Sequence, residues 1–151
     1  MSLAAPMTGY APVNGLQMYY EIHGTGQPLL LLHGAFMTIN LLGNLLAELA
    51  GTRQVIAVEL QGHGRTADTS RALSYEAMAD DVAALLGYLN LSQVDVFGYS
   101  RGGGVALQVA VRHPQAVRNL IVASASYRSE GVYPELLEGI KSMTPELDFG
   151  H

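Results

Sequence analysis

The 151-residue sequence contains no cysteine and no tryptophan, and only 14% of its residues are charged. The absence of cysteine excludes disulfide scaffolds, thiolate metal sites and a cysteine nucleophile from this sequence. The formal net charge is −5 and no basic block occurs, so bulk electrostatics does not favour binding to nucleic acid or to an anionic membrane. Hydrophobic residues make up 49% of the chain, which predicts a folded core rather than a disordered tail or a charge-rich coiled coil.

Long apolar runs are also lacking. The run from Leu29 to Leu32 is followed at once by His33 and Gly34, whereas a membrane-spanning helix needs about 20 apolar residues. Residues 1–6 contain no lysine, no arginine and no apolar segment of the kind that a secretory signal has. We therefore expect a cytoplasmic protein without a membrane partner. No metal-ligand spacing is present, and we expect neither a metal nor another cofactor.

Short apolar segments alternate with amphipathic ones along the chain. The strands are expected at residues 16–22, 29–32, 55–60, 94–97 and 119–123. The helices are expected at residues 40–50, from the N-cap Ser74 to about Leu89, at 102–113, and from Pro134 onward. Apolar residues surround segment 102–113, which predicts a deeply buried helix. Alternation of buried strands with helices is typical of an α/β fold, a mostly parallel sheet with helices on both faces.

One pentapeptide carries the sharpest chemical signal. Gly98-Tyr99-Ser100-Arg101-Gly102 is a G-x-S-x-G match between a predicted strand and a predicted helix. In that context the serine occupies a strained turn and acts as a nucleophile, and Gly98 and Gly102 are the elbow glycines that avoid a clash with it. The alternative is a glycine-rich turn that only packs a helix against a strand.

A second loop complements this serine. His33-Gly34-Ala35-Phe36 follows the predicted strand 29–32. Acyl transfer to serine requires two N–H groups aimed at the developing oxyanion, and Ala35 and Arg101 are the expected backbone donors. The side chains of Phe36 and Tyr99 flank these groups and are expected to line the substrate site. The alternative is that Gly34 only permits a sharp bend.

With the intervening Gly62-His63-Gly64-Arg65-Thr66 loop, these motifs occur in an order that resembles the α/β-hydrolase fold superfamily, in its serine-nucleophile branch with a lid. The resemblance implies hydrolysis of a small-molecule ester, thioester, lactone or carbon–carbon bond through an acyl-enzyme on Ser100. It also implies that residues 1–126 form the N-terminal part of the core and residues 127–151 begin the lid. The family commonly has Asp where this chain has Glu59. Relatives with an aspartate nucleophile are disfavoured because Ser100 occupies the nucleophile position.

The order of the family's triad is Ser, then an acid, then His. After Ser100 the sequence has only His113, expected at a helix C-terminus, and His151, which lies too close to Asp148 for a triad. The resemblance therefore implies that the base and the acid lie in a C-terminal half that this chain does not contain, and that the fold is truncated before its last strands. We expect this chain alone to be inactive. Strand 119–123 would then be an open edge that favours self-association or pairing with a complementary C-terminal fragment.

Two other functional interpretations stay open. Gly62-x-Gly64-x-x-Ala67 follows strand 55–60 and matches a relaxed dinucleotide fingerprint, although a helix would have to open at those glycines. A non-catalytic hydrolase-like fragment or binding module is the other alternative. The Arg101 side chain is expected to form a structural salt bridge, with an anionic substrate group as the alternative partner. The adjacent Asp80 and Asp81 are expected on a solvated helix face.

Overall fold

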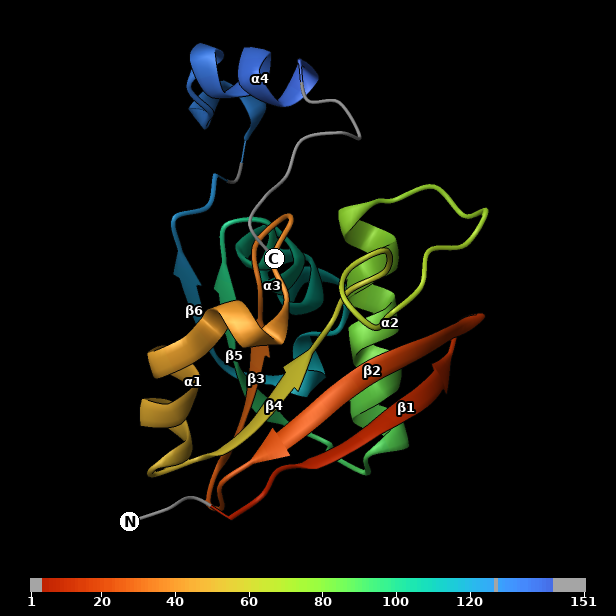
Figure 1. Ribbon diagram of the computed structural model, residues 1–151, viewed down its shortest axis with the longest axis vertical. Coiled ribbons are helices and arrows are strands. Elements are labelled where there is room, and N and C mark those ends of the chain that lie inside the picture. The colour runs from red at the N-terminus through yellow and green to blue at the C-terminus, as the bar shows by residue number, and fades with distance from the viewer. Residues whose placement is uncertain (1–3, 127, 143–151) are drawn as a thin grey trace.

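A six-stranded sheet in the order β1-β2-β4-β3-β5-β6 forms the centre of the molecule (Figure 1). The computed structural model describes residues 4–126 and 128–142. The strands are β1 (Met7–Val13), β2 (Leu16–His23), β3 (Pro28–Leu32), β4 (Gln54–Val58), β5 (Val94–Tyr99) and β6 (Val117–Ala123). The pairs β1–β2 and β2–β4 are antiparallel, and β4–β3, β3–β5 and β5–β6 are parallel. The predicted mostly parallel α/β sheet is confirmed.

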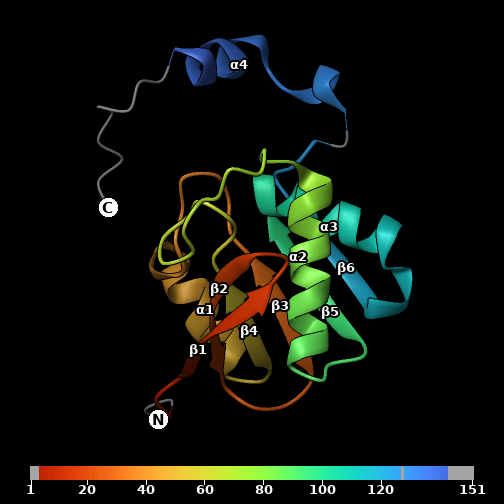
Figure 2. The ribbon, with the colours of Figure 1, turned by 90° about the vertical axis from the view of Figure 1, so that its right-hand side faces the viewer.

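Helices cover the sheet on both faces (Figure 2). The helices of the described residues are η1 (Ile39–Leu42), α1 (Gly43–Ala50), α2 (Tyr75–Tyr88), α3 (Arg101–Arg112), η2 (Pro114–Ala116), η3 (Ser129–Gly131) and α4 (Pro134–Lys141). One face of the sheet packs against η1 and α1, and the other against α2 and α3. Ser74 caps α2 as predicted, because its hydroxyl oxygen accepts a hydrogen bond from the Ala77 N–H.

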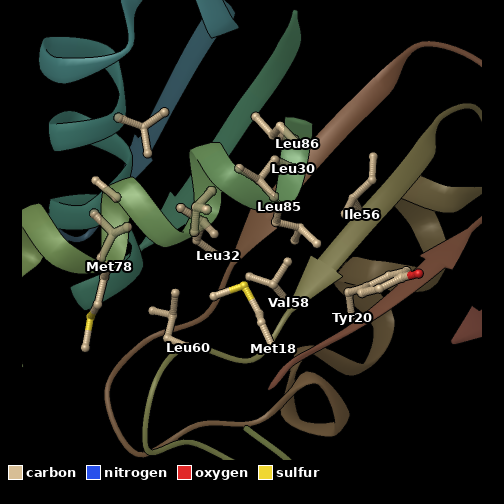
Figure 3. Close-up of a cluster of buried hydrophobic side chains, with 14 of the residues drawn as sticks. Met18, Tyr20, Leu30, Leu32, Ile56, Val58, Leu60, Met78, Leu85 and Leu86 are labelled. Atoms are coloured by element: carbon tan, nitrogen blue, oxygen red, sulfur yellow. The ribbon is translucent and has the colours of Figure 1, made fainter. Parts of the chain in front are cut away.

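Alternation along the central strands separates the core into two clusters. Leu30 and Leu32 of β3 lie with Ile56 and Val58 of β4 in the cluster under α2 and α3 (Figure 3). The residues between them, Leu29, Leu31, Val55 and Ala57, face η1 and α1. Both sets are buried, and each fully buried leucine, isoleucine or valine among them contributes about 1.5–3 kcal/mol. Burial on both faces explains why these strands consist of continuous apolar runs.

Three expectations about the elements were wrong. Strand β1 was not predicted, because its edge position leaves Met7, Thr8 and Tyr10 exposed and removes the apolar run that a buried strand shows. The predicted helix 40–50 is divided at Gly43, whose φ of 43° ends the 3₁₀ turn before α1 begins. Helix α3 is not deeply buried all round, since Val111 is 73% exposed.

Asp81 also departs from expectation. Its carboxylate is fully buried rather than on a solvated face, and it pairs with Arg71 at 2.6 Å and accepts a hydrogen bond from Asn14 Nδ2 at 3.0 Å. The adjacent Asp80 does lie on the outer side of α2, where it pairs with Arg112. Since adjacent helical residues point about 100° apart, the two carboxylates serve separate ion pairs.

Segment η3–α4 lies beyond the carboxyl ends of the parallel strands, away from the sheet (Figure 1). Its assignment to a lid stays a prediction, as does the division of the chain at residue 126. Asp148 and His151 lie outside the described residues. Strand β6 forms one edge of the described sheet, as expected. Within residues 4–126 and 128–142, no helix combines the length and apolar character that crossing a bilayer would take.

Candidate active site

Ser100 occupies the tight turn between β5 and α3. Its φ of 54° and ψ of −116° lie in a region that non-glycine residues rarely adopt. Such a conformation costs about 1–3 kcal/mol and persists only where surrounding contacts impose it. Here the Ser100 N–H donates to the Ala123 carbonyl at 2.9 Å, and the Ser100 carbonyl accepts from Gly103 N at 2.9 Å. Ser100 is therefore fixed from both sides at the N-terminus of α3.

The glycines around Ser100 are required by close backbone approach. A Cβ on Gly98 would lie 2.7 Å from Gly103 N and still closer to the Gly102 carbonyl oxygen. A Cβ on Gly102 would lie 2.6 Å from the His33 carbonyl oxygen, and one on Gly103 would lie 2.5 Å from Ala125 Cβ. Real Cβ atoms essentially never make contacts under 3.0 Å. Glycine is thus required at both positions, although a Cβ would clash with the backbone of α3 or of the loop after β3 rather than with Ser100 as predicted.

The loop after β3 lies directly against Ser100. A Cβ on Gly34 would be 3.4 Å from Ser100 Cβ and 3.2 Å from Tyr99 Cδ1. This proximity arises because β3 and β5 are parallel neighbours, with Leu32 paired to Gly98, so their carboxyl ends meet at one edge of the sheet. Ala35 is half-buried in this loop.

Two aromatic side chains flank this junction. Phe36, with a φ of 59°, is 43% exposed, and Tyr99 is 40% exposed. Gly34 meets Ser100 and Tyr99, so the loop that carries Ala35 and Phe36 adjoins the turn that carries Ser100 and Arg101. Their arrangement leaves exposed aromatic surface next to Ser100.

His33 is fully buried at the base of the same loop. Its Nε2 accepts a hydrogen bond from the Leu60 N–H at 3.1 Å, so this nitrogen carries no proton. The proton is then on Nδ1, which lies 2.7 Å from the Gly34 carbonyl and donates to it. Burial lowers the pKa of His33 to about 4. A neutral imidazole therefore ties the loop to the end of β4.

The turn after β4 is built around Glu59. Its buried carboxylate accepts from Arg65 N at 2.6 Å and Nη2 at 2.7 Å, and from Ile39 N at 3.2 Å. Burial favours the protonated acid, but the hydrogen bonds from Arg65 prevail and hold the pKa of Glu59 below its ordinary value. Thr66 donates to the Glu59 carbonyl at 2.6 Å. Glu59 and Thr66 thus have structural roles, and the glycines of this turn do not open a helix, since α2 begins only at Tyr75.

Each described histidine has a partner other than Ser100. His23 contacts Glu21 at 2.7 Å, and His113 contacts Asp80 at 2.7 Å. His63 Nδ1 lies 3.0 Å from the Gln61 carbonyl, and its ring is 4.9 Å from that of His33. Within residues 4–126 and 128–142, no hydrogen bond joins a histidine to the Ser100 side chain. No set of three or more ligating side chains in these ranges could hold a metal ion.

In the part of the chain that the structure describes, the salt bridge expected for Arg101 is not found. Among the described residues, the half-buried Arg101 forms no ion pair, and Glu59, Asp81 and Asp80 pair with other arginines. Instead Arg101 lines a cleft of about 230 Å³ with Leu73, Ser74, Tyr75 and Met78. These four cleft residues were missed by sequence reasoning. The available signal was topological: α2 and α3 both begin at the carboxyl edge of a parallel sheet, where α/β folds place ligands.

Comparison with known proteins agrees with this geometry. A family model described as the alpha/beta hydrolase fold matches residues 27–145. The chain belongs to this family. A 2-hydroxymuconate semialdehyde hydrolase of Pseudomonas sp. (strain CF600) is 33% identical over 135 residues, 85% of this chain and 46% of the relative. An uncharacterized protein of Mycobacterium tuberculosis (strain ATCC 25618 / H37Rv) is 36% identical over 123 residues, 82% of this chain and 36% of the relative.

Solved structures of this family superimpose on the chain as well. An epoxide hydrolase without ligand has a TM-score of 0.77 at 29% identity, covering 86% of this chain and 47% of that one. An N-acyl homoserine lactone degrading enzyme has a TM-score of 0.77 at 28% identity, covering 90% and 52%. The chain thus spans about half, or less, of the length of the relatives that it matches.

Proposed function

We propose that this chain carries the nucleophile and the oxyanion site of a serine hydrolase. The observation that supports this most is the left-handed backbone of Ser100 at a strand-to-helix turn, in contact with the loop after β3. A glycine would adopt that conformation without strain, so a serine there calls for a reason beyond packing. Curated relatives named as a semialdehyde hydrolase and as a putative carbamate hydrolase (the latter from Azorhizobium caulinodans) support hydrolysis as the reaction class.

In the proposed reaction, Ser100 Oγ attacks the acyl carbon of an ester, thioester, lactone or activated carbon–carbon bond. Its proton passes to a base, and the carbonyl oxygen becomes an oxyanion held by the N–H groups of Ala35 and Arg101. The N-terminal end of the α3 dipole adds positive potential at the same point. Collapse of the intermediate expels the protonated leaving group and leaves an acyl-serine, which water hydrolyses.

The base and the acid are proposed to come from a C-terminal region beyond the described residues. Every described histidine has another partner, and His33 is held neutral by burial with both ring nitrogens engaged. The 151-residue chain on its own is then a non-catalytic hydrolase-like module, which is the second candidate for what this molecule does. A longer protein that includes it would be the enzyme.

A fluorophosphonate probe tests the nucleophile. We expect covalent labelling of Ser100 in the longer protein, located by peptide mass spectrometry and abolished in Ser100→Ala. Ser92→Ala, an exposed serine in the loop before β5, is the matched control and should label as the parent does. Turnover of p-nitrophenyl acetate should be high for the longer protein and near background for residues 1–151. A folded longer protein that does not label at Ser100 would refute the proposal.

A further inference from the structure

Arg101 differs from five other arginines of the chain in that no carboxylate balances its charge within the described residues. Five arginines each reach a carboxylate oxygen within 2.8 Å, namely Arg53, Arg65, Arg71, Arg112 and Arg118. Within the described part of the chain, Arg101 has no such carboxylate, although its side chain is half-buried. A partly desolvated guanidinium without a counter-charge loses part of its hydration free energy, and no ion pair compensates for this loss. The position therefore fits an anion that arrives from outside.

The surroundings of Arg101 form a bounded cleft rather than open surface. The cleft of about 230 Å³ lies between the first residues of α2 and of α3. Tyr75 forms a fixed wall, because its ring packs on Gly104 so closely that a Cβ there would lie 2.7 Å from Tyr75 Cε1. Leu73 and Met78 supply apolar surface. Such a cleft fits a short hydrocarbon chain that ends in a polar group.

Donor groups converge on the cleft with Arg101. Ser74 Oγ accepts from the Ala77 N–H at 3.0 Å, so its own hydroxyl proton stays available to donate. The helices α2 and α3 both direct their positive N-terminal ends at this point. Burial lowers the pKa values of His33 and His63, and the charge of Arg101 acts in the same direction. Among the described residues that line the cleft, Arg101 is the basic one and none is acidic.

We propose that Arg101 binds a carboxylate on the substrate, so that the preferred acyl group carries a negative charge at its far end. This rests on the proposed function, because Arg101 is one peptide unit, about 3.8 Å between Cα atoms, from the candidate nucleophile. A single guanidinium with a hydroxyl matches the flat, singly charged carboxylate, which an arginine binds through paired N–H donors. The apolar walls match the methylene groups between that carboxylate and the reacting carbonyl.

The test compares two esters that differ only in this charge. The p-nitrophenyl half-ester of glutaric acid carries the carboxylate, and the corresponding glutaramic acid ester carries a neutral amide of the same shape. We expect the longer protein to favour the glutaric half-ester in kcat/KM by about tenfold or more. Both esters use the same peptide N–H of Arg101. The ratio of their kcat/KM values therefore reports only the contribution of the Arg101 side chain.

Variants at matched charge then locate the effect. Arg101→Met should abolish the preference, and Arg101→Lys should retain part of it. Arg112→Met removes the same unit of charge from the exposed end of α3 and should leave the ratio unchanged. An unchanged ratio in Arg101→Met, or a parent protein without any preference for the half-ester, would overturn the proposal.

A binding measurement separates this proposal from the proposed function. Titration calorimetry with glutarate on Ser100→Ala should show saturable binding that is lost when Arg101→Met is added. If Ser100 labels with fluorophosphonate but glutarate does not bind, only the carboxylate site is refuted. If glutarate binds but Ser100 does not label, only the hydrolase is refuted. Displacement of glutarate by an equal concentration of inorganic phosphate would overturn the choice of a carboxylate.

Discussion

The buried His33 should make the stability of this protein depend on pH. In the native state burial lowers the pKa of His33 to about 4, whereas in an unfolded chain the imidazole has its ordinary pKa near 6.5. Between these values the unfolded state binds a proton that the native state does not. Stability therefore rises with pH in this window. The contribution of His33 is complete above about pH 6.5 and is lost progressively as the pH falls toward 4.

The size of the effect follows from the two pKa values. Each unit of pKa difference corresponds to about 1.4 kcal/mol, and between pH 7 and pH 5 the linkage integral gives a loss of about 2 kcal/mol. The full side chain is buried, so solvent screening does not reduce this figure by much. The structural cause is specific: protonation at Nε2 would replace the acceptor of the Leu60 N–H with a second donor.

Urea unfolding followed by circular dichroism would measure this, since the chain has no tryptophan to report by fluorescence. The variant His33→Gln keeps a hydrogen-bond acceptor and a donor but does not titrate. Apart from any change that the two proteins share, the unfolding free energy of the parent should fall by about 2 kcal/mol more than that of the variant between pH 7 and pH 5. Should this variant not fold, the imidazole resonance of His33 in the parent can be followed by NMR. Equal pH dependence in parent and variant, or a His33 resonance that titrates above pH 6, would refute the reasoning.

Other perturbations test the packing around the site and the sheet edge. Gly102→Ala should lower the unfolding free energy by about 3 kcal/mol, because its Cβ would meet backbone carbonyls at the end of β3. The control Gly87→Ala lies in α2 with open space around it, so it should leave the unfolding free energy unchanged or raise it by up to about 1 kcal/mol. Arg71→Met should lower the unfolding free energy by about 3 kcal/mol, because the buried carboxylate of Asp81 loses its counter-charge. Urea unfolding measures the effect of each of these three substitutions. The 151-residue chain should self-associate through β6, where Ile121 is 44% exposed, and Ile121→Lys should restore a monomer in light scattering. A monodisperse parent chain would contradict that last expectation.

Sequence patterns located the central strands because burial on both faces demands continuous apolar residues. Segment 29–32 is such a run, and β3 is buried on both faces. At the edge the same reasoning failed, since β1 faces the core only through Ala11 and Val13. The break at Gly43 was also invisible, because the leucines on either side of it keep a helical spacing. Leu41 and Leu45 are 49% and 39% exposed, so this spacing overstated the buried face of the segment.

The candidate site divides in the same way between local and tertiary information. The glycines on either side of Ser100 could be placed from sequence, because close backbone approach demands that residue type wherever it occurs. The partner of a charged side chain is a tertiary property. The sequence predicts a solvated face for Asp81 and a structural salt bridge for Arg101, yet Asp81 is buried in an ion pair and Arg101 has no described counter-charge. No local pattern distinguishes these outcomes.

The two halves of the proposed chemistry depend on different parts of the molecule. The proposed oxyanion donors and Ser100 are held by the pairing of β3 with β5 and by the contacts at Gly34 and Gly102, all within the described core. Proton transfer depends on a base that no described histidine supplies to Ser100. Oxyanion binding can therefore be complete where proton transfer is not. On that reasoning residues 1–151 should retain the geometry of the site while a phosphonate, which needs an activated Oγ, reacts slowly with it. Rapid labelling of the 151-residue chain would show instead that a base lies within it.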